Sequence, residues 1–328
     1  MILNKKQLHS VIFGAPQIDC NDSVVSCYRF SKKQIARIAS SSQDFAMKAK
    51  STSSVRLDFY TDSEYLAFSY ANAQKAGSRP WYYFSLYVNE KPFAIFGEEQ
   101  LTKTANTQRF ELPAGEKRIT LFFPNLFRAD ILSLELSDGA SITPFTPKRR
   151  IIFHGDSITQ GYDSKDPALS YVNRLAIAWD AEIINYGIGG ATFNAKVIDE
   201  TIVPKADAVF VSYGTNDWKT RPSFQLFVTG CTDFFKKVAS VYPNLSVVTI
   251  LPIWRFNYKD EYPVGDFMAA RQEIARIAKA TANANVIDLW QDIPQDLMFF
   301  TDGLHPNDDG FAYYANGVNN KIKEQHVL

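Results

Sequence analysis

Four short segments of this chain carry residue types that nucleophilic catalysis uses. The first, residues 154–161 (HGDSITQG), places Ser157 directly after an apolar run, where a strand is expected to meet a helix. A serine at a helix N-terminus can act as a nucleophile, because backbone N–H groups and the helix dipole favour developing negative charge there. Serine is also a common helix N-cap, so this segment alone leaves both roles open.

The base that such a serine needs stands in residues 302–307 (DGLHPN), just before the last apolar-periodic segment. His305 is one of four histidines, and Asp302 lies three residues before it. A loop can fold the Asp302 carboxylate against the imidazole, fixing its tautomer and stabilising the imidazolium formed when the serine loses its proton. A loop histidine beside a capping aspartate is the alternative. A metal site is disfavoured, because no second histidine stands at ligand spacing and the cysteines are scattered.

Two further segments offer hydrogen-bond donors for an oxyanion. Residues 185–192 (NYGIGGAT) bring glycines, whose backbone can approach a ligand closely. Residues 213–218 (YGTNDW) bring Asn216, a neutral amide donor. The alternative for the glycine segment is a turn that needs positive φ, and the alternative for Asn216 is ordinary Asn-Asp turn chemistry. Gly187 and Gly189 also match two positions of a dinucleotide-binding fingerprint, but Thr192 stands at its third position, which makes that match weak.

The elements that must position these residues can be read from the same half of the chain. Short apolar runs suited to buried parallel strands begin at residues 151, 182, 208 and 246, and helical apolar spacing begins near residues 224, 267 and 311. This alternation predicts a doubly wound α/β domain over residues 150–328, in which ligands bind at the carboxyl ends of the strands. Nucleophile, base, carboxylate and oxyanion donors can therefore converge on one edge of the sheet.

Residues 1–145 follow a different pattern. Apolar and polar residues alternate over residues 55–60, 119–123 and 132–136, and residues 81–88 and 93–96 flank a short turn typical of a hairpin. These runs predict an all-β sandwich or jelly roll, with one helical turn left open at residues 32–38. The linker at residues 143–150 is short and lacks a Gly/Ser-rich stretch, so we expect the two domains to dock through an apolar interface.

Composition narrows the class of protein. The 328 residues are 46% hydrophobic, 14% aromatic and 21% charged, which is typical of about two globular domains. Lys+Arg and Asp+Glu both number 35, and this neutral balance disfavours nucleic acid or anionic membrane as partners. Three cysteines do not make a disulfide framework. The chain begins without the apolar run of a signal peptide, so we expect a cytoplasmic protein; its oligomeric state stays open.

In order, the four segments resemble the four sequence blocks of the SGNH (GDSL) hydrolase superfamily. The resemblance covers residues 150–328 and is specific, because all four blocks occur in the right order and spacing. It implies a flavodoxin-like three-layer fold in which Ser157 is the nucleophile, His305 the general base and Asp302 its partner. The Ser157 N–H, the Gly190 N–H and the Asn216 side chain would form the oxyanion hole.

Within the second block, Gly190 is preferred over Gly189, because the family places this glycine just before an acidic or small residue and a threonine. The β-rich front half is similar to the jelly-roll module of some carbohydrate acetylesterases, a likeness of architecture only.

The function that follows is a serine esterase working through an acyl-enzyme, without cofactor or metal. The expected substrate is a short acyl ester, such as acetyl, of a sugar or small polyol. Trp218 and Trp254 follow predicted strands and would either form a sugar-stacking wall or pack in the core. One alternative is an acyltransferase that uses the same site. The other is a carbohydrate-binding protein with an inactive rear domain, which the complete set of catalytic residue types argues against.

Overall fold

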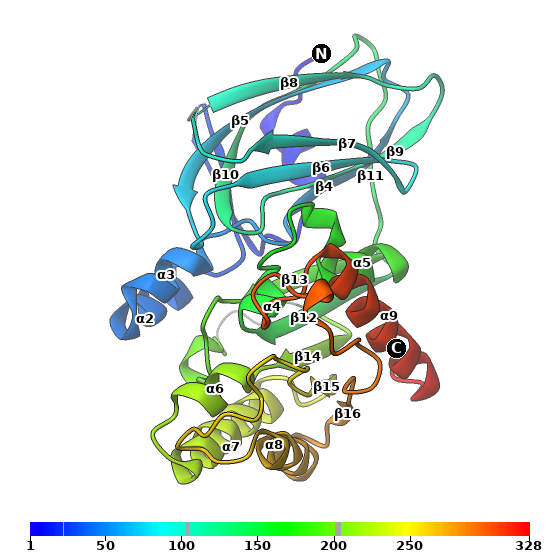
Figure 1. Ribbon diagram of the computed structural model, residues 1–328. Coiled ribbons are helices and arrows are strands. Elements are labelled where there is room, and N and C mark those ends of the chain that lie inside the picture. The colour runs from blue at the N-terminus through cyan, green and yellow to red at the C-terminus, as the bar shows by residue number, and fades with distance from the viewer. Residues whose placement is uncertain (22, 103–104, 201–204) are drawn as a thin grey trace.

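The computed structural model describes residues 1–21, 23–102, 105–200 and 205–328 (Figure 1). Antiparallel sheets form the N-terminal part, and a parallel sheet with helices forms the C-terminal part, as the alternation of apolar residues predicts. Among the described helices, none has both the length and the apolar character needed to cross a membrane.

The two antiparallel sheets enclose one core. One sheet has the strand order β1-β4-β9-β6-β7, with β11 paired to β4, and the other has the order β2-β3-β10-β5-β8. Aromatic rings from both sheets meet between them, as Phe68 and Phe84 do at 5.5 Å between centroids. The strands are β1 (Ile12–Phe13), β2 (Gln17–Cys20), β3 (Val25–Tyr28), β4 (Arg56–Thr61), β5 (Tyr65–Lys75), β6 (Tyr82–Val88), β7 (Lys91–Glu98), β8 (Ala105–Glu111), β9 (Lys117–Phe122), β10 (Phe127–Leu136) and β11 (Thr143–Pro144).

The strands predicted from alternation are present, including the β6–β7 hairpin. Its turn residues Asn89 and Glu90 both have positive φ, the backbone that a two-residue hairpin turn requires. One side chain departs from the pattern: Leu132 in β10 is exposed. A register shift between Ile131 and Ser133 breaks the pairing with β5, and such a bulge turns the next side chain to the other face.

The described N-terminal part contains three helices, of which the sequence left open only a helical turn at residues 32–38. They are α1 (Lys5–Ser10), α2 (Lys32–Ser41) and α3 (Gln43–Ala49). Ser31 caps α2 in a reciprocal capping box with Gln34. Buried residues of α2 and α3, such as Ile38, belong to the core on one face of the parallel sheet, with Ile184 and Tyr186. The helical turn left open at residues 32–38 is present as part of α2, and the all-β description of residues 1–145 is wrong for the rest of α2, for α3 and for α1. Helices α2 and α3 contribute to the hydrophobic core of the other part.

The parallel sheet has the order β13-β12-β14-β15-β16. Its strands are β12 (Arg149–Gly155), β13 (Ala181–Gly187), β14 (Ala208–Ser212), β15 (Ser246–Ile250) and β16 (Asn285–Ile287). Helices α7 and α8 cover one face, while α5 and α9 cover the other. The helices are α4 (Ser157–Gln160), α5 (Tyr171–Ala178), α6 (Thr215–Thr220), α7 (Phe224–Val241), α8 (Phe267–Ala282) and α9 (Asp308–Glu324), with short 3₁₀ turns η1 (Pro167–Leu169), η2 (Ala195–Val197) and η3 (Leu297–Phe299).

The two parts contact each other through apolar side chains, as expected, and also through buried hydrogen bonds. Arg29 is fully buried, and its Nη1 donates to the carbonyls of Asn185 (2.5 Å) and Gly187 (2.9 Å). Arg56 Nη2 donates to the carbonyl of Ala181 at 2.9 Å. Gln160 Nε2 reaches back to three acceptors of the N-terminal part. Because unpaired buried polar groups are costly, these bonds fix the two parts in one arrangement.

Candidate active site

Three neighbouring strands of the parallel sheet end at the same edge and present the first three segments there. Ser157 follows β12, Gly190 follows β13 and Asn216 follows β14, in α6. The last segment, with His305, arrives in the loop before α9. The convergence that the alternation of strands and helices predicts is present, because parallel strands all run in one direction and their carboxyl ends share an edge.

Ser157, His305 and Asp302 form two hydrogen bonds in series. His305 Nε2 lies 2.8 Å from Ser157 Oγ, and its Nδ1 lies 2.8 Å from Asp302 Oδ2. The other carboxylate oxygen, Asp302 Oδ1, accepts the N–H groups of Leu304 (3.1 Å) and His305 (2.9 Å). Partial burial alone would raise the pKa of Asp302, but the hydrogen bond and charge of His305 hold it well below its usual range. This arrangement can move a proton from the serine to the histidine.

The N-cap alternative for Ser157 is wrong, because Asp156 is the N-cap of α4. Its Oδ1 accepts the N–H of Ile158 at 3.0 Å, and Ser157 is the first residue of the helix. Burial raises the pKa of Asp156 to about 7. Since α4 has only four residues, its dipole is small, and an anion at Ser157 depends on individual N–H donors.

Gly155 is required by the close packing beneath the serine. A Cβ at this position would lie 2.1 Å from Thr159 Oγ1 and 2.9 Å from the Ser212 carbonyl. No side chain fits between β12, α4 and β14, so the glycine of this motif serves the backbone path that presents Ser157.

The two other candidate donors lie in adjoining loops. Gly190 has φ +83°, and within the described part of the chain its N–H has no hydrogen-bond acceptor. The N–H of Gly189, in contrast, donates to Gln160 Oε1 at 2.7 Å. Asn216 Nδ2 donates to the Ala191 carbonyl at 3.1 Å, which joins its loop to that of Gly190. Of the two glycines, Gly190 is therefore the one whose N–H is available to a ligand.

Asp217 and Arg221, which the sequence reasoning did not assign, brace these loops. Asp217 is buried and accepts the Phe193 N–H at 3.1 Å and Arg221 Nε at 3.1 Å. Arg221 Nη2 in turn donates to the Phe193 carbonyl at 2.6 Å. Burial raises the pKa of Asp217 to about 6, against the opposing effect of Arg221. Asp217 and Arg221 hold the segment after Gly190 against α6. Residues 216–217 therefore have a structural role in this turn in addition to the candidate role of Asn216 in the site.

The two tryptophans do not form a sugar-stacking wall. Trp218 is fully buried, donates from Nε1 to the Gly265 carbonyl at 2.7 Å and packs edge-on against Phe267. Trp254 is 7% exposed and packs on Phe300 at 5.0 Å between ring centroids. Both are core residues, which is the second of the two roles that the sequence left open for them.

A second carboxylate stands beside His305. Asp163, in the loop after α4, has its Oδ2 3.6 Å from His305 Nδ1. Arg79, in the loop between β5 and β6, donates to both oxygens of Asp163 (2.6 and 2.7 Å) and lies 3.4 Å from Asp302 Oδ2. Tyr162 stacks on the imidazole of His305, with 5.4 Å between centroids.

No sequence signal singles out Asp163 or Arg79. The atoms of Asp163, Asp302 and His305 that could bind a metal ion lie within 4.8 Å of one another. The guanidinium of Arg79 already supplies a positive charge to both carboxylates there.

Exposed apolar side chains lie next to the loop that carries Asp302 and His305. The Phe256 N–H donates to the Gly303 carbonyl at 2.7 Å, and a Cβ added at Gly303 would lie 3.4 Å from Leu297 Cδ2. Phe256 is 65% exposed and Leu297 50%, and Met298, the next residue, is 69% exposed. This edge of the site is therefore apolar and open to solvent.

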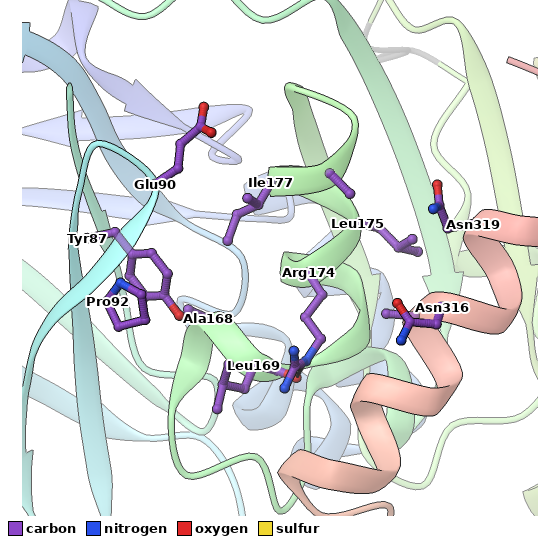
Figure 2. Close-up of a pocket in the computed structure, with 12 residues that line it drawn as sticks. Tyr87, Glu90, Pro92, Ala168, Leu169, Arg174, Leu175, Ile177, Asn316 and Asn319 are labelled. Carbon is purple, nitrogen blue, oxygen red and sulfur yellow. Dashed lines mark hydrogen bonds between the residues drawn. The ribbon is translucent and has the colours of Figure 1, made fainter.

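A separate cavity of about 400 Å³ lies away from these residues, where the β6–β7 hairpin meets α5 and α9 (Figure 2). Tyr87 and Pro92 of the hairpin line one side, Arg174 comes from α5, and Asn316 and Asn319 come from α9. Its lining includes none of the candidate catalytic residues.

Comparison with known proteins identifies the C-terminal part. Residues 153–313 match the family model described as the GDSL-like Lipase/Acylhydrolase family. No curated protein matches the chain in a sequence search.

Solved structures share the whole arrangement of this chain at low sequence identity. The salicylyl-acyltransferase SsfX3 from a tetracycline biosynthetic pathway has a TM-score of 0.80 and 18% identity, over 97% of this chain and 95% of that one. A family two carbohydrate esterase from Clostridium thermocellum, in complex with cellohexaose, has a TM-score of 0.68 and 15% identity, over 96% and 98% of the two chains. The acetyl xylan esterase Est2A from Butyrivibrio proteoclasticus has a TM-score of 0.62 and 13% identity, over 83% and 89%. These likenesses establish a common fold, including the β-rich front part.

Proposed function

We propose that this chain, which belongs to the GDSL-like lipase/acylhydrolase family through residues 153–313, is a serine esterase that works through an acyl-enzyme. The observation that carries the proposal is the pair of 2.8 Å hydrogen bonds linking Ser157 Oγ, His305 and Asp302 Oδ2. A nucleophile within reach of a base, which is itself oriented by a carboxylate, is the arrangement that acyl transfer needs.

In the first half of the reaction, His305 Nε2 takes the proton of Ser157 as Oγ attacks the ester carbonyl. The oxyanion accepts hydrogen bonds from the N–H groups of Ser157 and Gly190 and from Asn216 Nδ2. His305 then gives its proton to the alcohol oxygen as the ester bond breaks, which leaves the acyl group on Ser157. In the second half, His305 takes a proton from water as its oxygen attacks the acyl carbon, and then gives that proton to Ser157 Oγ as the bond between Oγ and the acyl carbon breaks and the carboxylic acid leaves.

The proposed substrates are short acyl esters, above all acetyl esters, of a sugar or a small polyol. Two of the structural neighbours support this choice, since one is an acetyl xylan esterase and another binds cellohexaose. The test compares p-nitrophenyl esters of rising chain length with a panel of acetylated sugars, for the wild type and for Ser157→Ala. We expect acetyl to be preferred and turnover to depend on Ser157. A wild-type enzyme inactive on every ester would refute the proposal.

An acyltransferase is the second candidate, and two observations favour it. The salicylyl-acyltransferase is similar over nearly the whole of both chains. The exposed apolar edge formed by Phe256, Leu297 and Met298 offers an acceptor alcohol a surface on which water competes poorly. Products formed from one acyl ester in the presence of added alcohols decide between the two: new esters in excess of free acid indicate transfer, and free acid alone indicates hydrolysis.

A further inference from the structure

The catalytic histidine faces two carboxylates through one ring nitrogen. His305 Nδ1 is 2.8 Å from Asp302 Oδ2 and 3.6 Å from Asp163 Oδ2. Nδ1 carries a single hydrogen, so it donates to the nearer oxygen, while the imidazolium formed during turnover is stabilised by both charges. Asp163 is 2% exposed, so little water screens its charge at this distance.

Two carboxylates this close to each other would repel, and Arg79 removes that repulsion. Its Nη2 lies 2.7 Å from Asp163 Oδ2 and 3.4 Å from Asp302 Oδ2, the same two oxygens that face the imidazole. Its Nε holds the other oxygen of Asp163 at 2.6 Å, so the pair is bidentate. The hydrogen bonds that Arg79 donates to Asp163 raise the pKa of Arg79, which keeps the guanidinium charged.

Arg79 comes from the N-terminal part of the chain, whereas the groups it contacts belong to the C-terminal part. It lies 84 positions before Asp163 and 223 before Asp302. Asp163 itself has φ +68°, in the left-handed region that few residues other than glycine adopt. A residue in this conformation persists only where its surroundings hold it, and here the bidentate arginine does so.

We propose that Asp163 and Arg79 are positioning residues for His305: Asp163 is a second carboxylate at Nδ1, and Arg79 holds both carboxylates in place across the boundary between the two parts. The proposal deepens the proposed function, on which its catalytic meaning rests. It gives the β-rich part a direct role in the site, besides any binding of substrate.

The proposal makes a prediction about charge that a merely structural ion pair does not. Asp302, Asp163 and Arg79 together place a net charge of about −1 at Nδ1, as in a site with one carboxylate. Replacing Arg79 by glutamine leaves two negative charges, which favours the imidazolium. Replacing Asp163 by asparagine leaves Arg79 opposite Asp302, which disfavours it. The two variants should therefore change the titration of His305 in opposite directions.

Other charges around the histidine are the same in all variants and do not alter this comparison. Tyr162 stacks on the ring, and Asp156 is close enough for its charge to interact with His305. Arg255 interacts with both Asp156 and Asp302. None of these groups is changed in the test.

The experiment measures the pH profile of kcat/KM on p-nitrophenyl acetate for Arg79→Gln, Asp163→Asn and the double variant. The acidic limb should move up by about one pH unit in Arg79→Gln and down by about one unit in Asp163→Asn. It should return close to the wild-type position in the double variant, whose net charge at Nδ1 is restored. NMR titration of the His305 ring, assigned with His305→Asn, reports the same shifts without turnover, so the proposal is testable even if no ester is hydrolysed.

Two further variants act as controls. Arg79→Lys keeps the charge and loses the bidentate geometry, so kcat should fall while the acidic limb stays in place. Arg109→Gln removes an exposed arginine that pairs with Glu111 elsewhere in the N-terminal part, and it should match the wild type. The proposal would be overturned if Arg79→Gln and Asp163→Asn moved the acidic limb in the same direction, or if neither moved it. If Arg79→Gln fails to fold, the absence of a downward shift in Asp163→Asn overturns the proposal.

Discussion

Replacing Asp302 by asparagine tests how the carboxylates orient His305, because the structure fixes how the new amide must point. Asp302 Oδ1 accepts two backbone N–H groups, and only the oxygen of an amide can take over that role. The amide nitrogen must then replace Oδ2, 2.8 Å from His305 Nδ1, and point its hydrogens at that nitrogen. The imidazole is driven to the tautomer with its proton on Nε2, which cannot accept the proton of Ser157.

The size of the loss depends on Asp163. A triad with a single carboxylate loses about 10⁴ in kcat on this change. Here Asp163 Oδ2, 3.6 Å from the same Nδ1, can still accept its hydrogen after a small movement of the ring. We therefore expect Asp302→Asn to lose about 10²–10³ in kcat, or ~3–4 kcal/mol of transition-state stabilisation, and the double variant with Asp163→Asn to lose about 10⁴.

Steady-state kinetics at the pH optimum of each variant measures these losses, with thermal unfolding as the control for folding. An Asp302→Asn enzyme close to the wild type would refute the orienting role of Asp302 and indicate a Ser157–His305 dyad. A double variant no slower than Asp302→Asn would show that Asp163 does not replace the lost carboxylate.

Three further predictions follow from the same site. Ser157→Ala should lower ester turnover by about 10³-fold or more while the melting temperature stays within a few degrees, because Asp156 and not Ser157 caps α4; half the wild-type activity would contradict the assignment. Asn216→Ala should lower kcat by ~10²–10³ with little change in KM, and a raised KM at constant kcat would instead mean that Asn216 binds the ground state. A fragment beginning near Lys148 should be poorly soluble and inactive, because it exposes the apolar surface that α2 and α3 cover and lacks Arg79; a cooperatively melting, fully active fragment would show an independent domain.

The sequence determined the parts of the site that local spacing and strand ends control. Asp302 and His305 are three residues apart, so a single loop brings them into contact, and their hydrogen bond could be expected from the sequence. Ser157, Gly190 and Asn216 each follow an apolar run, and parallel strands carry such positions to one edge of the sheet. Alternation and the hairpin turn likewise predict β4, β6, β7, β9 and β10, which are five of the eleven strands described in the front part.

Tertiary structure alone decided which residues meet across the two parts of the chain. Arg79 contacts Asp163 and Asp302 over separations of 84 and 223 residues, and such contacts leave no period or motif in the sequence. The helices at residues 32–49 form on the second part because its core needs their apolar faces, and Trp218 is buried because Tyr262 and Phe267 cover it. Local spacing thus predicts that a serine, a histidine and a carboxylate can act together. Only packing between distant segments places Asp163 and Arg79 beside His305.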